Sequence, residues 1–244
     1  MNNLKSALVF SMAILLVAGL AAFTYMNRNR TEDVISITGM GQLNFESDRI
    51  VWGAHFAETD LSLEKAYDKL NDNKALVEAY LKDSAVKPAE INFDPLVINK
   101  LYQDILNDKG AKVGEKFNGF ELLQSFWVDS PEVAKITAIS RDSTRLVKQG
   151  IELISGQPAY YFTKLADLKL KLIAAATQDA WSRAQEIATN SGAVLGKLRQ
   201  TNLGVFQIIG SNASPDATSW DGAFDTVSRF KTATITIHAQ YETR

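Results

Sequence analysis

The chain has 244 residues, of which 46% are apolar and 22% are charged, and its formal net charge at pH 7 is -2. The near-neutral charge, with no basic patch interleaved with aromatics, argues against nucleic-acid binding. The chain contains no cysteine, which excludes disulfides, thiolate chemistry, zinc–thiolate sites and lipoprotein acylation.

The first distinctive segment is an uncharged run from Ala7 to Met26. About 20 apolar residues suffice to cross a bilayer as a helix, so residues 1–26 are predicted to be a membrane anchor, followed by a polar linker over residues 27–33. A cleaved secretory signal is an alternative, for which Gly19-Leu20-Ala21 would serve as the cut site. A buried globular helix is the other alternative. Basic residues are nearly balanced on the two sides of the run, so they do not decide its orientation.

Alternation of apolar and polar residues predicts strands over residues 34–38 and 49–57. Gly39 and Gly41 lie between these strands. They lack the third glycine of a dinucleotide-binding fingerprint and do not lead directly into a helix. We therefore expect a backbone bulge or a close approach of another chain segment at this point.

The first helix of the soluble part is expected to begin near Leu61, with Asp60 as its cap. The residues that line one predicted face are Leu63, Ala66, Leu70, Val77 and Leu81. Residues 85–88 end the helix. Downstream, residues 91–105 and 116–128 are predicted to be the arms of a long hairpin.

The turn region of that hairpin contains Gly110 and Gly114. A second helix is predicted to start at Ser130 and Pro131, because a hydroxyl cap followed by proline is a typical helix start. This helix is expected to run to about residue 148, and Gly150 stops it.

The longest predicted helix covers residues 165–191 and ends at Gly192. The alanines that recur every four positions along it are Ala176, Ala180, Ala184 and Ala188. Alanine favours helix formation and permits close packing, so this face is predicted to pack on the sheet. Glu186 is placed on the exposed face.

Three further strands are predicted over residues 160–162, 197–209 and 230–241, and a polar, turn-rich loop covers residues 210–225. Strands mostly pair locally in this scheme, with helices between them. The predicted fold class is therefore α+β, with largely antiparallel strands and about three packed helices.

Candidate catalytic residues do not form a recognisable pattern. His55 and His238 lie in separate predicted strands and lack a metal-binding spacing. Ser62–Lys65 and Ser84–Lys87 match S-x-x-K, but residues 231–233 (Lys-Thr-Ala) lack the glycine of K-T-G, and no S-D-N is present. We therefore predict no catalytic residue, no metal site and no cofactor.

Four stretches, in a fixed order, carry a family resemblance. They are Ile35-Ser-Ile-Thr-Gly39-Met-Gly41, the helix over residues 62–81, the alanine-spaced segment of residues 174–197 with its Gly192-Ala-x-Leu195-Gly196, and the alternating strand of residues 232–237. Together they make the chain similar to the SIMPL-domain family of bacterial envelope proteins. Residues 34–244 are accordingly predicted to form a SIMPL-like α+β domain.

The resemblance implies export to the periplasm or outer membrane of bacteria, homo-oligomeric assembly, and in some branches a part in oxidative-stress defence. It supplies no catalytic residues. We therefore expect a non-enzymatic envelope protein, anchored through residues 7–26 with its soluble domain on the periplasmic side. Its expected mode of action is self-association or binding of an envelope protein partner, in envelope integrity or stress defence.

Two other functions stay open. One is a binding protein for a small ligand or a cell-wall fragment, in which tryptophans would provide stacking surfaces. The four tryptophans are Trp52, Trp127, Trp181 and Trp220. Trp220 suits the core least, because it lies in the polar loop. The other is an enzyme whose site is not visible from residue spacing.

Overall fold

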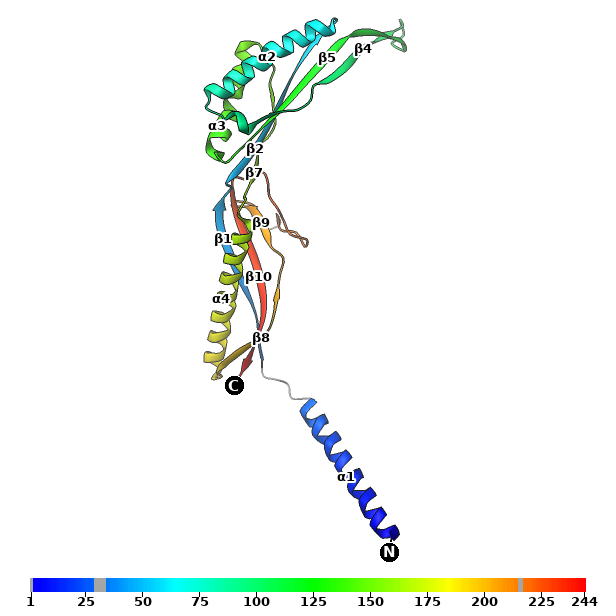
Figure 1. The fold of residues 1–244 in the computed structure, drawn as a ribbon, viewed down its shortest axis with the longest axis vertical. Coiled ribbons are helices and arrows are strands. Elements are labelled where there is room, and N and C mark those ends of the chain that lie inside the picture. The colour runs from blue at the N-terminus through cyan, green and yellow to red at the C-terminus, as the bar shows by residue number, and fades with distance from the viewer. Residues whose placement is uncertain (1, 29–33, 215–216) are drawn as a thin grey trace. The chain divides into compact units, whose positions relative to one another are not determined.

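The computed structural model describes residues 2–28, 34–214 and 217–244 (Figure 1). The chain divides into two compact units. The first combines residues 1–40, 177–204 and 237–244, and the second combines residues 41–176 and 205–236. Three long elements contribute residues to both units: β1 (Val34–Glu46), α4 (Leu165–Ser191) and β10 (Phe230–Thr243).

The N-terminal segment is helical, as α1 (Asn2–Arg28). Among the side chains that the structure describes, which in α1 are those of residues 11–25, no helix is long and apolar enough to cross a bilayer. Most of the predicted linker, residues 29–33, lies outside the described residues.

The first unit is built on a sheet in which β10 lies between β1 and β8 (Leu195–Leu203). β10 and β8 are antiparallel, with Ile237 opposite Leu203. The predicted strand over residues 197–209 was wrong in its length, because residues 204–206 interrupt it and a separate strand, β9 (Gln207–Gly210), follows. β9 pairs with the part of β10 that belongs to the second unit.

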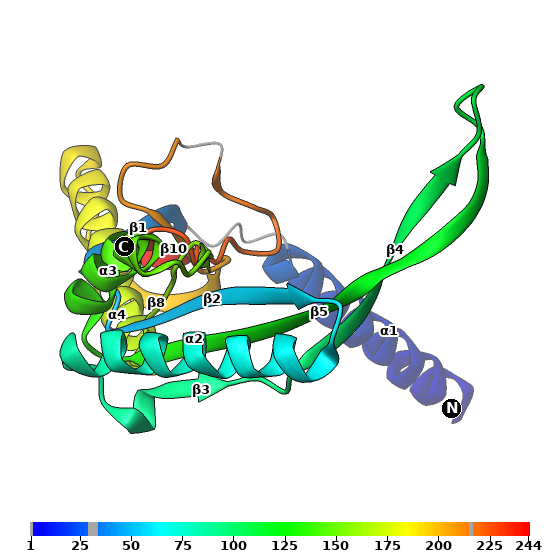
Figure 2. The same cartoon turned by 90° about the horizontal axis from the view of Figure 1, so that it is seen from above.

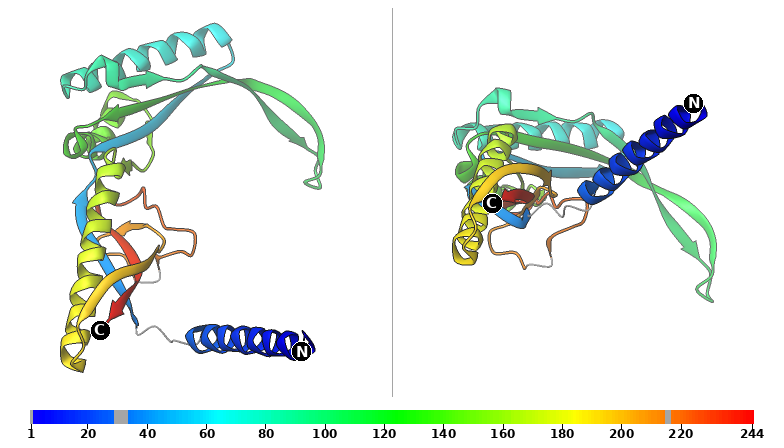
Figure 3. Two further views of the ribbon diagram at one scale, coloured as in Figure 1. Left: turned by 60° about the horizontal axis from the view of Figure 1, so that its bottom comes forward. Right: turned by 90° about the horizontal axis from the view of Figure 1, so that it is seen from below.

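The helix α4 has the predicted bounds and runs alongside β1 (Figure 3). The alanines predicted to pack on the sheet, Ala176, Ala180, Ala184 and Ala188, are each 0% exposed. Glu186 is exposed, as predicted. The absence of bulky side chains on this face lets the helix backbone come close to β1, so the alanine spacing predicted the packing correctly.

The second unit contains a six-stranded sheet. Its main order is β3 (Ile91–Phe93), β5 (Lys112–Ser130), β2 (Arg49–Asp60) and β6 (Ile154–Ser155), with β4 (Val97–Leu106) also on β5 and β7 (Ala159–Tyr161) also on β2. Each of these strand pairs is antiparallel. The predicted α+β class with antiparallel pairing is therefore confirmed.

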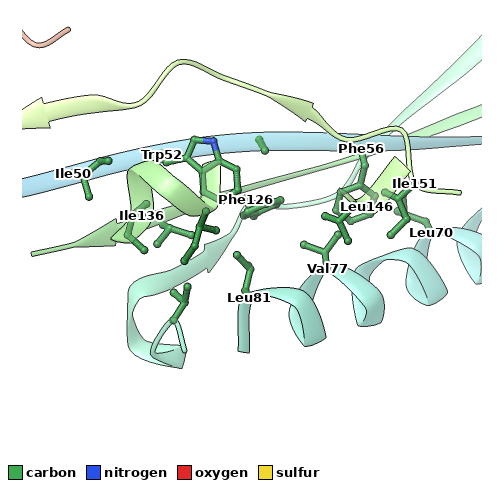
Figure 4. Packing of buried hydrophobic residues seen from close by; sticks show 14 of the residues in the cluster. Ile50, Trp52, Phe56, Leu70, Val77, Leu81, Phe126, Ile136, Leu146 and Ile151 are labelled. Carbon is green, nitrogen blue, oxygen red and sulfur yellow. The ribbon is translucent and has the colours of Figure 1, made fainter. Parts of the chain in front are cut away.

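Two helices cover this sheet: α2 (Leu63–Asp83), which lies along β2 and β5 (Figure 2), and α3 (Val133–Asp142). The buried residues labelled in the close-up come from the strands, from both helices and from the segment that follows α3 (Figure 4). Trp52 and Phe126, both almost fully buried, meet edge to face with ring centroids 5.6 Å apart. This geometry suits aromatic rings better than a face-to-face stack.

Several predicted helix ends were wrong. Ser62, not Asp60, caps α2, and its hydroxyl accepts a hydrogen bond from the backbone N–H of Lys65. Asp60 instead accepts one from the N–H of Ser62 at 3.0 Å. Leu63 is 41% exposed, because only the later residues of the predicted face reach the core.

The helix predicted to begin at Ser130 and Pro131 begins two residues later, at Val133. The Ser130 hydroxyl accepts a hydrogen bond from the N–H of Glu132 at 3.1 Å. The helix also ends early, and a 3-10 helix, η2 (Ser143–Gln149), continues to Gly150. Gly150 has φ 85, a left-handed conformation that glycine adopts without strain, so the predicted stop is confirmed.

Candidate interaction surface

The predicted long hairpin is present, but its first side is split into β3 and β4, both of which pair with β5. A short 3-10 helix, η1 (Pro88–Glu90), precedes β3. The outer part of the hairpin, residues 97–119, is called the arm below. It projects beyond the rest of its unit (Figures 2 and 3).

The arm is rich in exposed apolar side chains. Those at least 38% exposed are Val97, Ile98, Tyr102, Ile105, Leu106, Val113 and Phe117. The part of β5 that follows the arm is buried instead: Leu122 and Val128 are 0% exposed. A soluble monomer rarely exposes so dense a run of apolar side chains, so the arm is a candidate contact surface.

The exposure follows from the strand pairing. β2 pairs with β5 only from Phe120 onward, so residues 112–119 of β5 have β4 as their sole strand neighbour among the described residues. From Leu101 to Gly119 the arm is therefore a two-stranded ribbon, and among the described residues no third strand pairs with this part. Such a ribbon is only marginally stable alone in water.

Local contacts hold the arm together. The rings of Tyr102 and Phe117 face each other across the two strands with their centroids 6.0 Å apart. The ring of Phe117 also contacts that of Phe120, with the centroids 5.1 Å apart. Lys112 bridges Asp104 at 2.7 Å and also Glu115. The hydrogen bonds that the Lys112 ammonium donates to Asp104 and Glu115 raise the pKa of Lys112. Exposed pairs of this kind add little stability.

The arm carries two β-bulges, and both place the extra residue in β5. Leu101 faces Gly119 while Tyr102 faces Phe117, which leaves Asn118 as the extra residue. At the second bulge Ile105 faces Gly114 while Leu106 faces Lys112, so Val113 is the extra residue. β4 itself therefore keeps a regular alternation, and its outer edge has none of the bulges or prolines that block pairing at sheet edges.

The structure places His55 and His238, the two histidines considered in the sequence as a metal or acid–base pair, in different units. His55 lies in β2, half-buried, opposite Ser125 of β5. His238 lies in β10 of the first unit, where its Nδ1 is 2.8 Å from the Thr38 hydroxyl. Within the described residues, no group of three or more acidic or histidine side chains is placed to hold a metal ion.

The two S-x-x-K matches have structural positions. Ser62 is the N-cap of α2 and Ser84 is its C-cap. Residues 231–233 lie in β10 and pair with Gly210, Ile209 and Ile208 of β9. Among the described residues, no hydrogen bond joins Ser62 or Ser84 to Lys231. The structure does not bring these motifs together.

Residue spacing missed the role of Lys231. Its side chain is 2% exposed, and its Nζ donates a hydrogen bond to the backbone carbonyl of Asp225. Asp225 Oδ1 accepts from the N–H groups of Val227, at 2.7 Å, and Ser228, at 3.1 Å. The contact fastens the end of the loop over residues 210–225 to β10. The alternation of β10 could have revealed it, because Lys231 is in phase with buried Ala233 and Ile235.

The surroundings shift the pKa values of both Lys231 and Asp225. Burial lowers the pKa of Lys231, and the nearby Asp225 carboxylate offsets part of that effect. Burial would raise the pKa of Asp225, but hydrogen bonds from Ser228 and Val227 and the charge of Lys231 lower it overall. Asp225 Oδ2 is buried without a hydrogen-bond partner among the described residues.

The four tryptophans have different environments. Trp52 is in the core and Trp127 is half-buried, whereas Trp181 is 47% exposed. Trp220 is 96% exposed, which confirms that it is not a core residue. Separately, a groove of about 360 Å³ lies in the second unit. Its lining residues are Glu78, Lys82, Val86, Pro88, Ile91 and Phe93.

Comparison with known families matches residues 35–243 to SIMPL, described as a protein of unknown function (DUF541). No curated protein matches the chain. The matched range covers β1 to β10 and therefore both units, apart from the N-terminal helix. The chain belongs to the SIMPL family.

Proposed function

We propose that this SIMPL protein is a non-enzymatic component of the bacterial cell envelope that acts by self-association, with binding of another envelope protein as the closest alternative. The arm supports this proposal most. Its apolar side chains would lose their contact with water in a complex, and burial of apolar area is the main driving force of protein association.

The proposed location rests on the N-terminal segment and on the family. Residues 7–26 are uncharged and long enough to span the hydrocarbon core of a bilayer. We place the soluble domain on the periplasmic side, with a role in envelope integrity or oxidative-stress defence. Growth of a deletion strain in detergent and in peroxide, compared with its complemented parent, tests that role.

Self-association is tested by sedimentation of the full chain in detergent. The native chain is expected to sediment as an oligomer. A variant with Ile98→Ser, Tyr102→Ser and Leu106→Ser should shift toward the monomer, because it removes apolar area from the arm. Leu170→Ser is the control for losing an exposed apolar side chain outside the arm, since Leu170 is 68% exposed but lies on α4. A native chain that stays monomeric at every concentration would exclude the proposal.

The membrane anchor has its own test. An uncleaved anchor leaves a full-length chain in the membrane fraction, resistant to extraction by carbonate. A cleaved signal would instead give a soluble periplasmic protein. Its mass would correspond to a chain whose N-terminus lies near residue 22. For orientation, a single cysteine at Ser191 can be introduced into this cysteine-free chain. A membrane-impermeant maleimide should label it from the periplasm.

Binding of a small ligand or cell-wall fragment is the alternative function. The groove beside Ile91 and Phe93 is lined by apolar side chains together with Lys82 and Glu78, a composition common in ligand sites. Titration with muropeptides, followed by tryptophan fluorescence and calorimetry, tests it. A flat response in both measurements would remove the support for this alternative.

A further inference from the structure

We infer that two copies of the chain join through the outer edges of their β4 strands, antiparallel and related by a two-fold axis at Tyr102. The inference rests on the proposed self-association and specifies its surface. In the dimer the two arms would form one continuous four-stranded sheet, ordered β5, β4, β4 of the partner and β5 of the partner.

The edge needed for this pairing is available. β4 pairs with β5 along its whole length from Val97 to Leu106, and among the described residues no strand pairs with its other side. Exposed edges of this length are usually protected by bulges, prolines, charged side chains or a covering element. The charged residues of β4 are Lys100 and Asp104, and they match each other in the pairing described below. β4 has no proline and no bulge of its own, and the side chains along it are mostly exposed.

The residues of β4 are arranged so that the strand complements itself. Side chains two residues apart share one face of a strand. The residues on the face of Tyr102 are Ile98, Lys100, Tyr102, Asp104 and Leu106. Antiparallel pairing about Tyr102 places Lys100 opposite Asp104 of the other copy, twice, and Ile98 opposite Leu106, twice. Tyr102 meets its own equivalent at the axis.

Charge complementarity therefore favours a second copy as the occupant and fixes the register. An axis at Leu101 would place Asp104 opposite Ile98, and an axis at Gln103 would place it opposite Tyr102. Opposite charges directly across an antiparallel pair are favourable, whereas those alternatives leave them unmatched. Asp104 already contacts Lys112 of its own chain, so in the dimer each Asp104 carboxylate would lie between two lysines.

Site-directed cross-linking of the full chain in detergent tests the axis. Directly opposite residues in an antiparallel pair have Cα atoms about 4.5–5.5 Å apart, within the range that a disulfide spans. Because the chain has no cysteine, Tyr102→Cys provides a single thiol. It should convert most of the protein to a covalent dimer under mild oxidation. Val113→Cys, exposed on the other strand of the arm, should not.

The register has a second test. Lys100→Cys alone and Asp104→Cys alone should cross-link poorly, because the like residues of two copies would be offset by four positions, about 13 Å. A mixture of the two variants should cross-link efficiently. Charge reversal gives a parallel measurement: Lys100→Asp should weaken dimerisation roughly tenfold. Mixing it with Asp104→Lys should restore association.

The outcomes separate this inference from the proposed function. An oligomer by sedimentation in which Tyr102→Cys forms no dimer would overturn the β4 pairing and leave self-association standing. A native chain that is strictly monomeric would overturn both. Cross-linking of Tyr102→Cys to a different protein in intact cells, through a cysteine of that protein, would replace the second copy with a heterologous partner and overturn the inference as well.

Discussion

A Cβ atom at Gly41 would lie 2.3 Å from the backbone carbonyl oxygen of Leu172. Gly41 is in β1 and Leu172 is in α4. The same atom would lie 3.0 Å from the backbone nitrogen of Ala176. The helix therefore approaches the strand backbone directly, and only glycine at residue 41 permits this distance. The close chain approach predicted for Gly39 and Gly41 is confirmed at Gly41.

Gly41→Ala is expected to destabilise the protein, because the helix backbone, and not a flexible side chain, must move. Overpacking of this kind costs about 1–3 kcal/mol or more. The free energy of unfolding in urea measures it. Gly53→Ala in β2 is the matched control, since its nearest contact would be an ordinary 3.7 Å to the carbonyl oxygen of Phe126. Equal unfolding midpoints for the two variants would contradict the close approach.

Ala184→Leu tests the buried face of α4. Ala184 is 0% exposed, so the larger side chain has no free space and should lower the free energy of unfolding by about 1–3 kcal/mol. Glu186→Gln, on the exposed face of the same helix, should change it by less than about 0.5 kcal/mol. Urea denaturation of both variants measures these changes in the free energy of unfolding. A tolerated leucine would mean that the helix can move away from the sheet at low cost.

The elements that could be predicted were those whose residue pattern is set by one dominant contact. The helix over residues 165–191 was found with its bounds because its alanines recur every four positions against a single sheet. The start of α2 was misplaced because Asp60 and Ser62 both carry a suitable cap oxygen. The choice between them depends on where β2 ends, which is decided by its pairing with Phe120 of β5.

The candidate surface was harder to predict than the fold. Alternation in residues 97–119 indicates strands, but it does not say whether anything covers their faces. That depends on where β2 stops pairing with β5, a relationship between segments far apart in the sequence. Lys231 was likewise missed, because its partner Asp225 contributes a backbone carbonyl, which no residue motif records.

Asp179→Asn should reduce stability near neutral pH and have little effect in acid. The carboxylate accepts a hydrogen bond from the backbone N–H of Met40 at 2.8 Å and pairs with Arg183 at 2.9 Å. The N–H of Met40 first, and Arg183 second, lower the pKa of Asp179. A carboxylate with a lowered pKa stabilises the fold above the pKa of the unfolded chain, about 3.9. That stabilisation is lost as the pH falls through the folded pKa.

The measurement is the urea midpoint of the native chain and of Asp179→Asn between pH 7 and pH 3. The two curves should differ most at pH 7, and the difference should narrow as the pH falls below the unfolded pKa of about 3.9. Asp68→Asn, at an exposed position of α2, is the control for general effects of removing a charge. A constant difference across the range would show that the carboxylate charge of Asp179 is not what stabilises the contact with Met40.

Lys231 and Asp225 should prove energetically coupled. Lys231→Met keeps the apolar stem in the buried site but removes the ammonium, which leaves the Asp225 carbonyl without this donor and its carboxylate without the adjacent cation. An unsatisfied buried acceptor costs about 1–3 kcal/mol. In the Asp225→Asn background no carboxylate charge remains, so the same substitution should cost less. A double-mutant cycle in urea measures the difference, expected at about 0.5–3 kcal/mol for groups in contact. If the two single costs simply add, the Asp225 carboxylate is not coupled to the Lys231 ammonium, and Lys231 holds the loop over residues 210–225 through the backbone carbonyl of Asp225 alone.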